Sequence, residues 1–354
     1  MIFTETRLIP ATTDAILEAA ELIRAGGLVA FPTETVYGLG ANAQNTDAVT
    51  RIFTAKGRPT TDPLIVHIAD RNQLERVVSA ITPLAEQLIA TFWPGALTLI
   101  LPRHTSIPAI VSAGLPTVAV RMPNHPVALA LLEASGVPVA APSANRFAHT
   151  SPTTAQHVYD DLAGRLHLIL DGGSTAIGVE STILDLTSDP PRVLRPGGIS
   201  LAALRDMIPG VILVSRYADS NIATPNPEAH IAPGQLLIHY APKATLYLFE
   251  GTDASIYREI RQAAADQQTA GQRVALLIAD DDLAPLADLG LSVVSLGRLA
   301  DLSTVAQRLF AGLRDLDAQD VTVILARSFT EDGIGAAIRD RLIRAAAGRL
   351  IRVD

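Results

Sequence analysis

Short apolar runs alternate with amphipathic segments along residues 1–208. The apolar runs at residues 28–31, 64–68 and 117–121 predict buried β-strands. Between such runs, segments like residues 12–25 place an apolar residue at every third or fourth position, which predicts amphipathic α-helices. Strands and helices that alternate along a chain are typical of the α/β class, so the pattern predicts an α/β domain here.

The periodic pattern fades between residues 209 and 243 and then returns. The interval is rich in Pro, Asn, Ala and Ser, which is typical of a linker. Near its end, His239 and Tyr240 lie between two prolines, and such residues are uncommon in linkers, which indicates that this part returns to the first domain. Residues 244–354 again alternate strands and helices, and they predict a small parallel α/β domain of Rossmann-like type. This second domain carries no phosphate-binding glycine motif, so no catalysis is assigned to it.

Composition narrows the class of protein. The chain is 48% hydrophobic and 18% charged, which is typical of a soluble globular protein. No apolar run has the length of a membrane span and the first residues lack the layout of a secretory signal, so we expect a cytoplasmic protein without a membrane partner. The absence of cysteine excludes disulfides and thiolate chemistry, and the eight histidines form no HExxH-like pairing, so no metal site is predicted. The net charge of −8 argues against stable nucleic-acid binding.

The segment AAPSANRFAHTSP, at residues 140–152, is a candidate binding loop. Ser143, Asn145 and Ser151 place short polar side chains on a backbone with little bulk, which suits an anion or a nucleotide. The helix that follows is expected to begin with Ser151 as its cap and Pro152 in its first turn. Pro-Ser-Ala-Asn is also ordinary turn chemistry, so this segment alone supports binding and a plain turn equally.

A second candidate, KGRP, follows a helix expected over residues 46–55. Lys56 and Arg58 project from a backbone that Gly57 and Pro59 constrain. Two cations in a turn are often solvated surface residues. The rigid backbone here favours the other interpretation, a clamp for phosphate groups.

Further polar residues stand at or near the ends of other predicted strands. Thr35 is expected on a turn that Gly38 and Gly40 close. His67 lies inside an apolar strand, a position where a hydrogen-bonded core histidine is the more common role. Arg121 ends its strand, where it either holds a carboxylate through a bidentate fork or caps a surface edge. Because ligands of α/β sheets bind at strand ends, these positions predict one cleft assembled from distant segments.

Several segments together resemble the threonylcarbamoyl-adenylate synthases, in the longer form that joins a YrdC-like catalytic domain to a small C-terminal domain. They occur in order along the chain: FPTETVYGLGANA, KGRP with DPLIVHI, FWPGALTLIL, VAVRMP, APSAN with SPT, GVESTILDL, LRPGGIS and HYAP. The resemblance implies an α/β fold in three parts. These are a YrdC-like domain with a twisted mixed sheet and a surface cleft over residues 1–208, a linker over 209–243 that forms a lid on the active site, and a Rossmann-like domain over 244–354.

The resemblance also implies the reaction. Members of the family are nucleotidyltransferases that couple L-threonine, bicarbonate and ATP into threonylcarbamoyl-AMP and pyrophosphate, for threonylcarbamoyladenosine modification of tRNA. ATP is then a substrate accompanied by Mg²⁺, and the downstream partner is the tRNA threonylcarbamoyl-transferase machinery. Transfer at phosphorus requires alignment and charge neutralisation more than a protein nucleophile, which fits the basic residues singled out above.

Individual positions take their expected roles from the same resemblance. The expected catalytic residues are Lys56 and Arg58. The residues expected to bind ATP are Arg58, Asp62, Thr117, Ser143, Asn145, Ser151, Arg195 and Tyr240. The residues expected to bind L-threonine are Thr35, His67, Arg121, Ala141 and Ser181. For His67 this role weakens the core interpretation that its pattern favours.

Two positions depart from the family pattern. Asp62 stands where the family usually has Asn, which places an extra carboxylate near phosphate groups unless it meets a cation. Ile238 stands where a basic residue usually precedes HYAP, which puts a phosphate contact from that point in doubt.

Two alternative functions use the same domain type. One is a YrdC-like module that binds double-stranded RNA, and the net negative charge argues against it. The other is carbamoyl transfer through a carbamoyl adenylate. Related chains with that activity carry further modules with metal-binding cysteines, and this chain has neither.

Overall fold

The computed structural model describes residues 5–214 and 240–354, and its contacts divide into two compact units. Most of the predicted linker, including Ile238 and His239, lies outside the described residues, so its boundaries and its role as a lid stay predictions. Of the described residues, the first unit comprises 5–147, 152–176 and 180–214, and the second comprises 148–151, 177–179 and 240–354.

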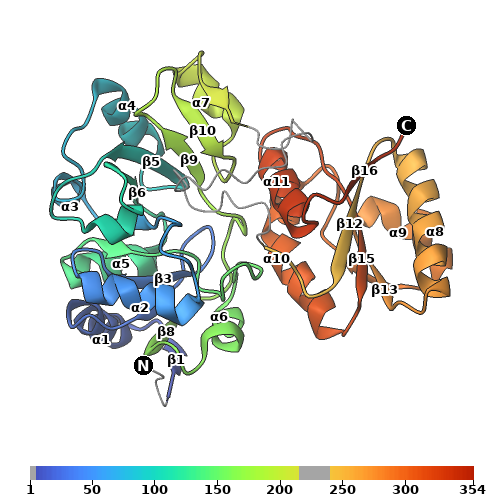
Figure 1. The fold of residues 1–354 in the computed structure, drawn as a ribbon, viewed down its shortest axis with the longest axis horizontal. Helices are drawn as coiled ribbons and strands as arrows, with labels where there is room; N and C mark the ends of the chain where they lie inside the picture. Colours follow the sequence, from blue (N-terminus) through green and yellow to red (C-terminus); the bar gives the residue numbers. More distant parts are fainter. Residues whose placement is uncertain (1–4, 215–239) are drawn as a thin grey trace. The chain divides into compact units, whose positions relative to one another are not determined.

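The first unit is built on a mixed sheet, whose described strands form one eleven-stranded array (Figure 1). Parallel and antiparallel neighbours occur together in it, as the resemblance implies for the fold class. In sheet order the strands are β1 (Arg7–Pro10), β8 (Leu168–Asp171), β2 (Val29–Phe31), β3 (Gly38–Asn42), β7 (Val139–Ala140), β4 (Ile65–His67), β6 (Thr117–Arg121), β5 (Leu97–Pro102), β9 (Thr182–Asp185), β10 (Arg192–Arg195) and β11 (Ile212–Leu213).

Helices of the first unit cover both faces of this sheet. The described helices are α1 (Thr13–Arg24), α2 (Thr46–Lys56), α3 (Arg71–Glu75), α4 (Pro83–Phe92), the 3₁₀ helix η1 (Ala109–Ser112), α5 (Pro126–Ser135), α6 (Ala155–Leu162) and α7 (Leu201–Met207).

Strand β2 shows how the sheet separates two apolar cores. Val29 and Phe31 pack in one core with α1 and α5. Ala30 lies between them in the chain and packs in the other core, with α2, α4 and α6. Because successive side chains of a strand point to opposite faces, this alternation fixes a helical layer on each side.

Two local expectations are wrong, each for a physical reason. The helix after Pro152 begins at Ala155, because the Thr154 side chain accepts the hydrogen bond of the His157 amide and so caps it in place of Ser151. Gly40 belongs to β3 and not to a turn.

Close packing within the sheet explains this glycine. A Cβ at Gly40 would lie 2.8 Å from the ring of Phe31 and 2.9 Å from Cγ1 of Val139. Gly38 pairs directly with Phe31 in the antiparallel β2–β3 ladder. These glycines therefore allow β2, β3 and β7 to approach one another, and the chain reverses before them, within residues 32–37.

The second unit is a parallel five-stranded sheet, which confirms the predicted Rossmann-like class (Figure 1). In sheet order its strands are β14 (Ser292–Ser295), β13 (Val274–Ile278), β15 (Val323–Arg327), β12 (Thr245–Glu250) and β16 (Leu350–Arg352). Its helices are α8 (Asp253–Thr269), η2 (Asp280–Asp282), α9 (Leu283–Leu286), η3 (Ala287–Leu289), α10 (Leu302–Ala318) and α11 (Gly335–Ala345), with α8 and α9 on one face and α10 and α11 on the other. Within residues 5–214 and 240–354, no helix combines the length and the apolar character that crossing a membrane requires.

Candidate functional site

Lys56 joins the two loops that the sequence singles out. It ends α2, where the left-handed conformation of Gly57 (φ 66°) stops the helix and turns the chain into KGRP. Its buried Nζ donates hydrogen bonds of 2.6 Å to the carbonyl oxygens of Ser143 and of Asn145. Burial, and secondarily the charge of Arg58, lower the pKa of Lys56 well below its usual value. Lys56 thus ties the KGRP turn to the backbone at Ser143 and Asn145, and the role of KGRP as a phosphate clamp stays a prediction.

Arg58 and Asp62 form a buried ion pair. Arg58 Nη2 lies 3.0 Å from Asp62 Oδ1, and Asp62 is fully buried. The same guanidinium donates to the backbone carbonyl oxygens of Asp62 (3.2 Å) and Pro63 (2.7 Å). The unusual carboxylate at position 62 therefore meets a cation, which is the condition that the sequence interpretation sets for it.

Arg121 is the centre of a third group of contacts, here called the Arg121 cluster: Arg121, Thr33, Glu34, Thr35 and His67. Arg121 donates from Nη1 to Thr35 Oγ1 (2.9 Å), and its Nη2 lies 2.6 Å from Oε1 of Glu34. Thr35 Oγ1 in turn lies 2.8 Å from Thr33 Oγ1, which donates to the carbonyl oxygen of Val36 (2.6 Å). All five members of the cluster are buried.

His67 enters this cluster through the sheet. Strands β4 and β6 run parallel, and their register places His67 beside Arg121. Burial, and next the charge of Arg121, lower the pKa of His67 to about 3, so the imidazole is neutral at physiological pH. Its Nδ1 is buried and accepts or donates no hydrogen bond among the described residues. A buried, neutral and uncompensated ring nitrogen beside an arginine is unusual for a purely structural core histidine.

Ser181 and Arg195 form a fourth group, although the sequence interpretation gives them different ligands. Arg195 donates from Nε and Nη2 to the carbonyl oxygen of Ser181, at 3.1 and 3.0 Å, and from Nη2 to its hydroxyl at 3.1 Å. The Ser181 hydroxyl also lies 2.7 Å from the hydroxyl of Thr98 on β5. Strand β9, which begins after Ser181, lies between β5 and β10 in the sheet, so three neighbouring strands hold this group together.

The remaining candidates lie on the same framework or in the second unit. Ala141 follows β7 and donates its amide to the Ile65 carbonyl oxygen (2.9 Å), while Thr117 opens β6. Ser151 is fully buried and groups with the second unit. In that unit the Tyr240 ring stacks on Phe310 with centroids 5.3 Å apart, and the guanidinium carbon of Arg341 lies over the Tyr240 ring, 5.3 Å from its centroid. The roles of Ser151 and Tyr240 in ATP binding, like those of the other site residues, stay predictions.

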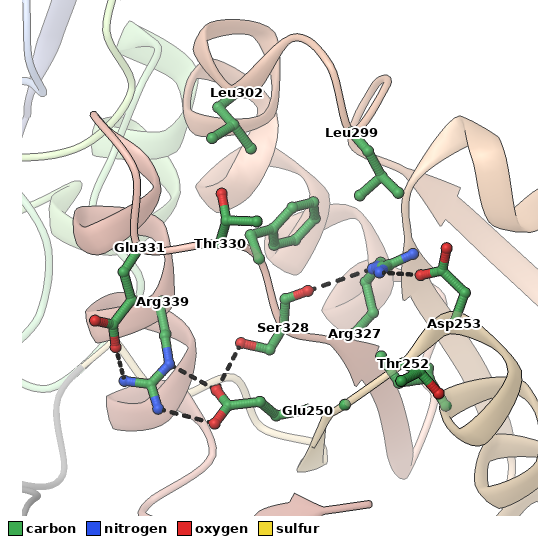
Figure 2. A pocket seen from close by; sticks show the side chains of 13 residues that line it. Glu250, Thr252, Asp253, Leu299, Leu302, Arg327, Ser328, Thr330, Glu331 and Arg339 are labelled. Atoms are coloured by element: carbon green, nitrogen blue, oxygen red, sulfur yellow. Dashed lines mark hydrogen bonds and ion pairs between the residues drawn. The ribbon is translucent and has the colours of Figure 1, made fainter. Parts of the chain in front are cut away.

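The second unit has a pocket of its own at the carboxyl ends of β12 and β15 (Figure 2). These adjacent strands lead into helices on opposite faces of the sheet, which is the arrangement that opens a crevice in parallel α/β folds. The pocket has a volume of about 600 Å³. Arg339 pairs with Glu250 and Glu331, and Arg327 with Asp253. Both lining arginines are thus bound by carboxylates, so this pocket does not offer free cations to a phosphate.

Metal ligation has no counterpart in the geometry of the described residues. Among residues 5–214 and 240–354, no three His, Asp or Glu side chains gather closely enough to hold a metal ion. The buried carboxylates Glu34 and Asp62 each face an arginine.

Sequence reasoning missed two members of these groups. Thr33 and Glu34 immediately precede the predicted Thr35, and neither receives a role from the motifs. The available signal was a charged residue between two threonines directly after a buried strand, a position at which burial requires a partner. Only the fold shows that the partner is Arg121.

Two family models match the chain. The model for the Sua5, YciO and YrdC proteins, described as telomere recombination, matches residues 21–197, which is half of the chain. The model described as the C-terminal domain of threonylcarbamoyl-AMP synthase matches residues 199–347. Fold and motifs thus define a YrdC-like α/β protein with an additional Rossmann-like unit.

Relatives over the full length narrow this class. The chain is 48% identical over 339 residues to the threonylcarbamoyl-AMP synthase of Bacillus subtilis, covering 95% of this chain and 94% of that protein. It is 44% identical over 335 residues to the one of Pyrococcus abyssi, covering 95% of each. A crystal structure of P. abyssi Sua5 complexed with L-threonine superposes with a TM-score of 0.90 at 43% identity, covering 99% of this chain and 100% of that one. The chain belongs to the threonylcarbamoyl-AMP synthase family, which confirms the predicted family, fold class and enzyme class.

Proposed function

We propose that this protein catalyses the formation of threonylcarbamoyl-AMP and pyrophosphate from L-threonine, bicarbonate or carbon dioxide, and ATP. The observation that carries the proposal is the tie from Lys56 Nζ to the carbonyl oxygens of Ser143 and Asn145. It joins the KGRP and SAN segments, which lie far apart in the sequence, by two hydrogen bonds. The family membership reported above supports the reaction.

The proposed reaction has two chemical steps. The ammonium group of threonine first loses a proton to solvent. The free amine nitrogen then forms a bond to the carbon of carbon dioxide while one carbon–oxygen π bond opens and a second proton passes to solvent, which gives a carbamate. A carbamate oxygen then attacks the α-phosphorus of ATP while the bond to pyrophosphate breaks. Both steps depend on alignment and on stabilisation of negative charge, and neither requires a covalent enzyme intermediate.

The roles of the residues follow from their contacts. Arg58 is held by Asp62 and two carbonyl groups, which gives its charge a fixed position for the nucleotide. Arg121 is assigned to the threonine carboxylate, because its Nη2 group makes no hydrogen bond among the described residues. Arg195 and Ser181 lie in direct contact, so we propose that they act where the two substrates meet.

We propose that Mg²⁺ enters with the triphosphate and takes its ligands from phosphate oxygens and water, a coordination that this ion favours. The adenylate is expected to pass to the tRNA threonylcarbamoyl-transferase machinery, without stable binding of nucleic acid by this chain. Such a pathway requires ATP and tRNA, and we therefore propose a cytoplasmic location. The three-part division at residues 1–208, 209–243 and 244–354, with the linker as a lid that keeps water from the adenylate, belongs to the same proposal.

Asp62→Asn is expected to lower the KM for ATP by about threefold to tenfold and to leave the KM for L-threonine unchanged. The substitution removes a buried negative charge beside the nucleotide, and two unit charges about 4 Å apart interact by roughly 1 kcal/mol even in bulk water. Arg58 keeps its two carbonyl acceptors. Steady-state kinetics with each substrate varied in turn measures the effect. An unchanged or raised KM for ATP would show that Asp62 does not act on bound phosphate.

The proposed reaction is tested by pyrophosphate release from the full chain, with ATP present and L-threonine, bicarbonate or Mg²⁺ omitted in turn. We expect release only in the complete mixture. L-Serine and L-valine serve as controls for the amino acid, because each lacks one substituent of threonine's side chain. Release that does not depend on threonine would refute the proposal.

A further inference from the structure

Glu34 is a buried carboxylate of the Arg121 cluster to which no role has been given so far. It lies in the turn after β2, with Pro32 and Thr33 between it and the end of the strand, and is 7% exposed. Its Oε1 lies 2.6 Å from Arg121 Nη2, and neither of its oxygens accepts a hydrogen bond from the described residues. An ionised carboxylate has about four acceptor positions, so a single ion pair leaves most of them unused. Burial without further partners is costly, which suggests that a ligand supplies them.

Arg121 is fixed on its other sides. Its Nε donates to the Gly95 carbonyl oxygen (3.0 Å) and its Nη1 to Thr35 Oγ1 (2.9 Å). The Nη2 group, which faces Glu34, makes no hydrogen bond of good geometry among the described residues. Arg121 and Glu34 therefore present one donor group and one carboxylate, side by side, with unused hydrogen-bonding capacity.

A pair of opposite charges selects the charge type of its ligand. A ligand with only a carboxylate would gain Arg121 but meet the like charge of Glu34 close by. A ligand with only an ammonium group would gain Glu34 but meet the like charge of Arg121. An α-amino acid carries both groups on one carbon atom, so its zwitterion satisfies the arginine and the glutamate together.

The neighbouring histidines do not alter this balance at neutral pH. The pKa of His67 is lowered to about 3, and burial lowers the pKa of His125 as well. Both imidazoles are then mainly neutral, and the charge of the Arg121 cluster comes from Arg121 and Glu34.

We infer that Glu34 binds the α-ammonium group of the amino-acid substrate while Arg121 binds its carboxylate. This inference rests on the proposed function and adds to it the recognition of the amine that becomes the carbamate nitrogen. It makes the site selective for α-amino acids over hydroxy acids of the same shape.

The test compares two ligands by isothermal titration calorimetry on the full chain. L-Threonine carries both charges, and (R)-3-hydroxybutyrate is the analogue that lacks the amino group. In the unsubstituted protein we expect L-threonine to bind at least tenfold more tightly. In Glu34→Gln we expect the affinity for L-threonine to fall by about tenfold to a hundredfold, the range for a hydrogen bond to a charged group. The affinity for (R)-3-hydroxybutyrate is expected to stay the same or rise, because the like charge is gone.

Control variants separate binding from structure. Glu133→Gln makes the same substitution at an exposed position on α5 and is expected to change neither affinity. Glu34→Asp keeps the charge and is expected to retain the preference for L-threonine, which keeps the test decisive if Glu34→Gln does not fold. Equal weakening of both ligands in Glu34→Gln, or loss of the preference in Glu34→Asp, would overturn the inference and leave the proposed reaction standing. Failure of the unsubstituted protein to bind L-threonine would instead contradict the proposed function.

Discussion

Replacing Lys56 by methionine is expected to destabilise the protein by about 3 kcal/mol and to lower the rate of adenylate formation by at least about a hundredfold. Methionine keeps most of the side-chain volume of lysine but cannot donate a hydrogen bond. The carbonyl oxygens of Ser143 and Asn145 then lose their bonds to Nζ in a buried setting. An acceptor left unsatisfied in this way costs about 1–3 kcal/mol. The loop that carries the SAN segment also loses its fixed position, which lowers the rate beyond the effect on stability.

Chemical denaturation and product formation measure the two effects. Lys243→Met is the matched control, because Lys56 and Lys243 are the two lysines of the chain and Lys243 is exposed. We expect the control to retain stability and activity. If Lys56→Met kept the stability of the parent protein and lost only activity, Lys56 would act on the substrate and not on the loop.

Stability is expected to fall on acidification, in a manner that depends on His67. The pKa of its imidazole is about 3 in the folded protein, below the ordinary value of 6.5. Below about pH 6.5 the unfolded chain therefore binds a proton at His67, whereas the folded protein does not. The contribution of neutral His67 to the free energy of unfolding is fully present above the pKa of the unfolded chain. It is lost as the pH falls toward the pKa of the folded protein. Between pH 7 and pH 4 the loss amounts to about 3 kcal/mol.

The free energy of unfolding of the parent protein and of His67→Gln, measured from pH 7 to pH 4, tests this linkage. We expect the parent protein to lose about 3 kcal/mol more than the variant over that range. His149→Gln, at an exposed histidine, serves as control and is expected to follow the parent protein. Parallel curves for the parent protein and His67→Gln would show that His67 accepts a proton in the fold.

The strand and helix pattern could be predicted where the apolar period was regular. Strand β6 has the predicted bounds, because its apolar run ends at polar residues that define it locally. The start of α6 was not predictable in the same way. Ser151 and Thr154 are both acceptable caps, and the hydrogen bond to His157 decides between them.

The hydrogen-bond and ion-pair partners of the site residues could be identified only from the three-dimensional fold. The motifs point to Lys56, Arg58 and Arg121, but sequence distance does not reveal which groups occupy their donors. The carboxylate that pairs with Arg58 is four residues away in the sequence. The one that pairs with Arg121, Glu34, is 87 residues away. Strands β3, β7 and β4 lie between β2 and β6 in the sheet, so the contact between Arg121 and Glu34 depends on the tertiary fold, on which local sequence patterns contain no information.

The measurement that tests the central claim most directly is the mass of the nucleotide product formed from ATP, L-threonine and isotopically labelled bicarbonate. With ¹³C-bicarbonate in excess, we predict threonylcarbamoyl-AMP that is one mass unit heavier than the unlabelled product, in amounts equal to the pyrophosphate released. A nucleotide product without the label, or pyrophosphate without any threonine-containing adenylate, would contradict the account.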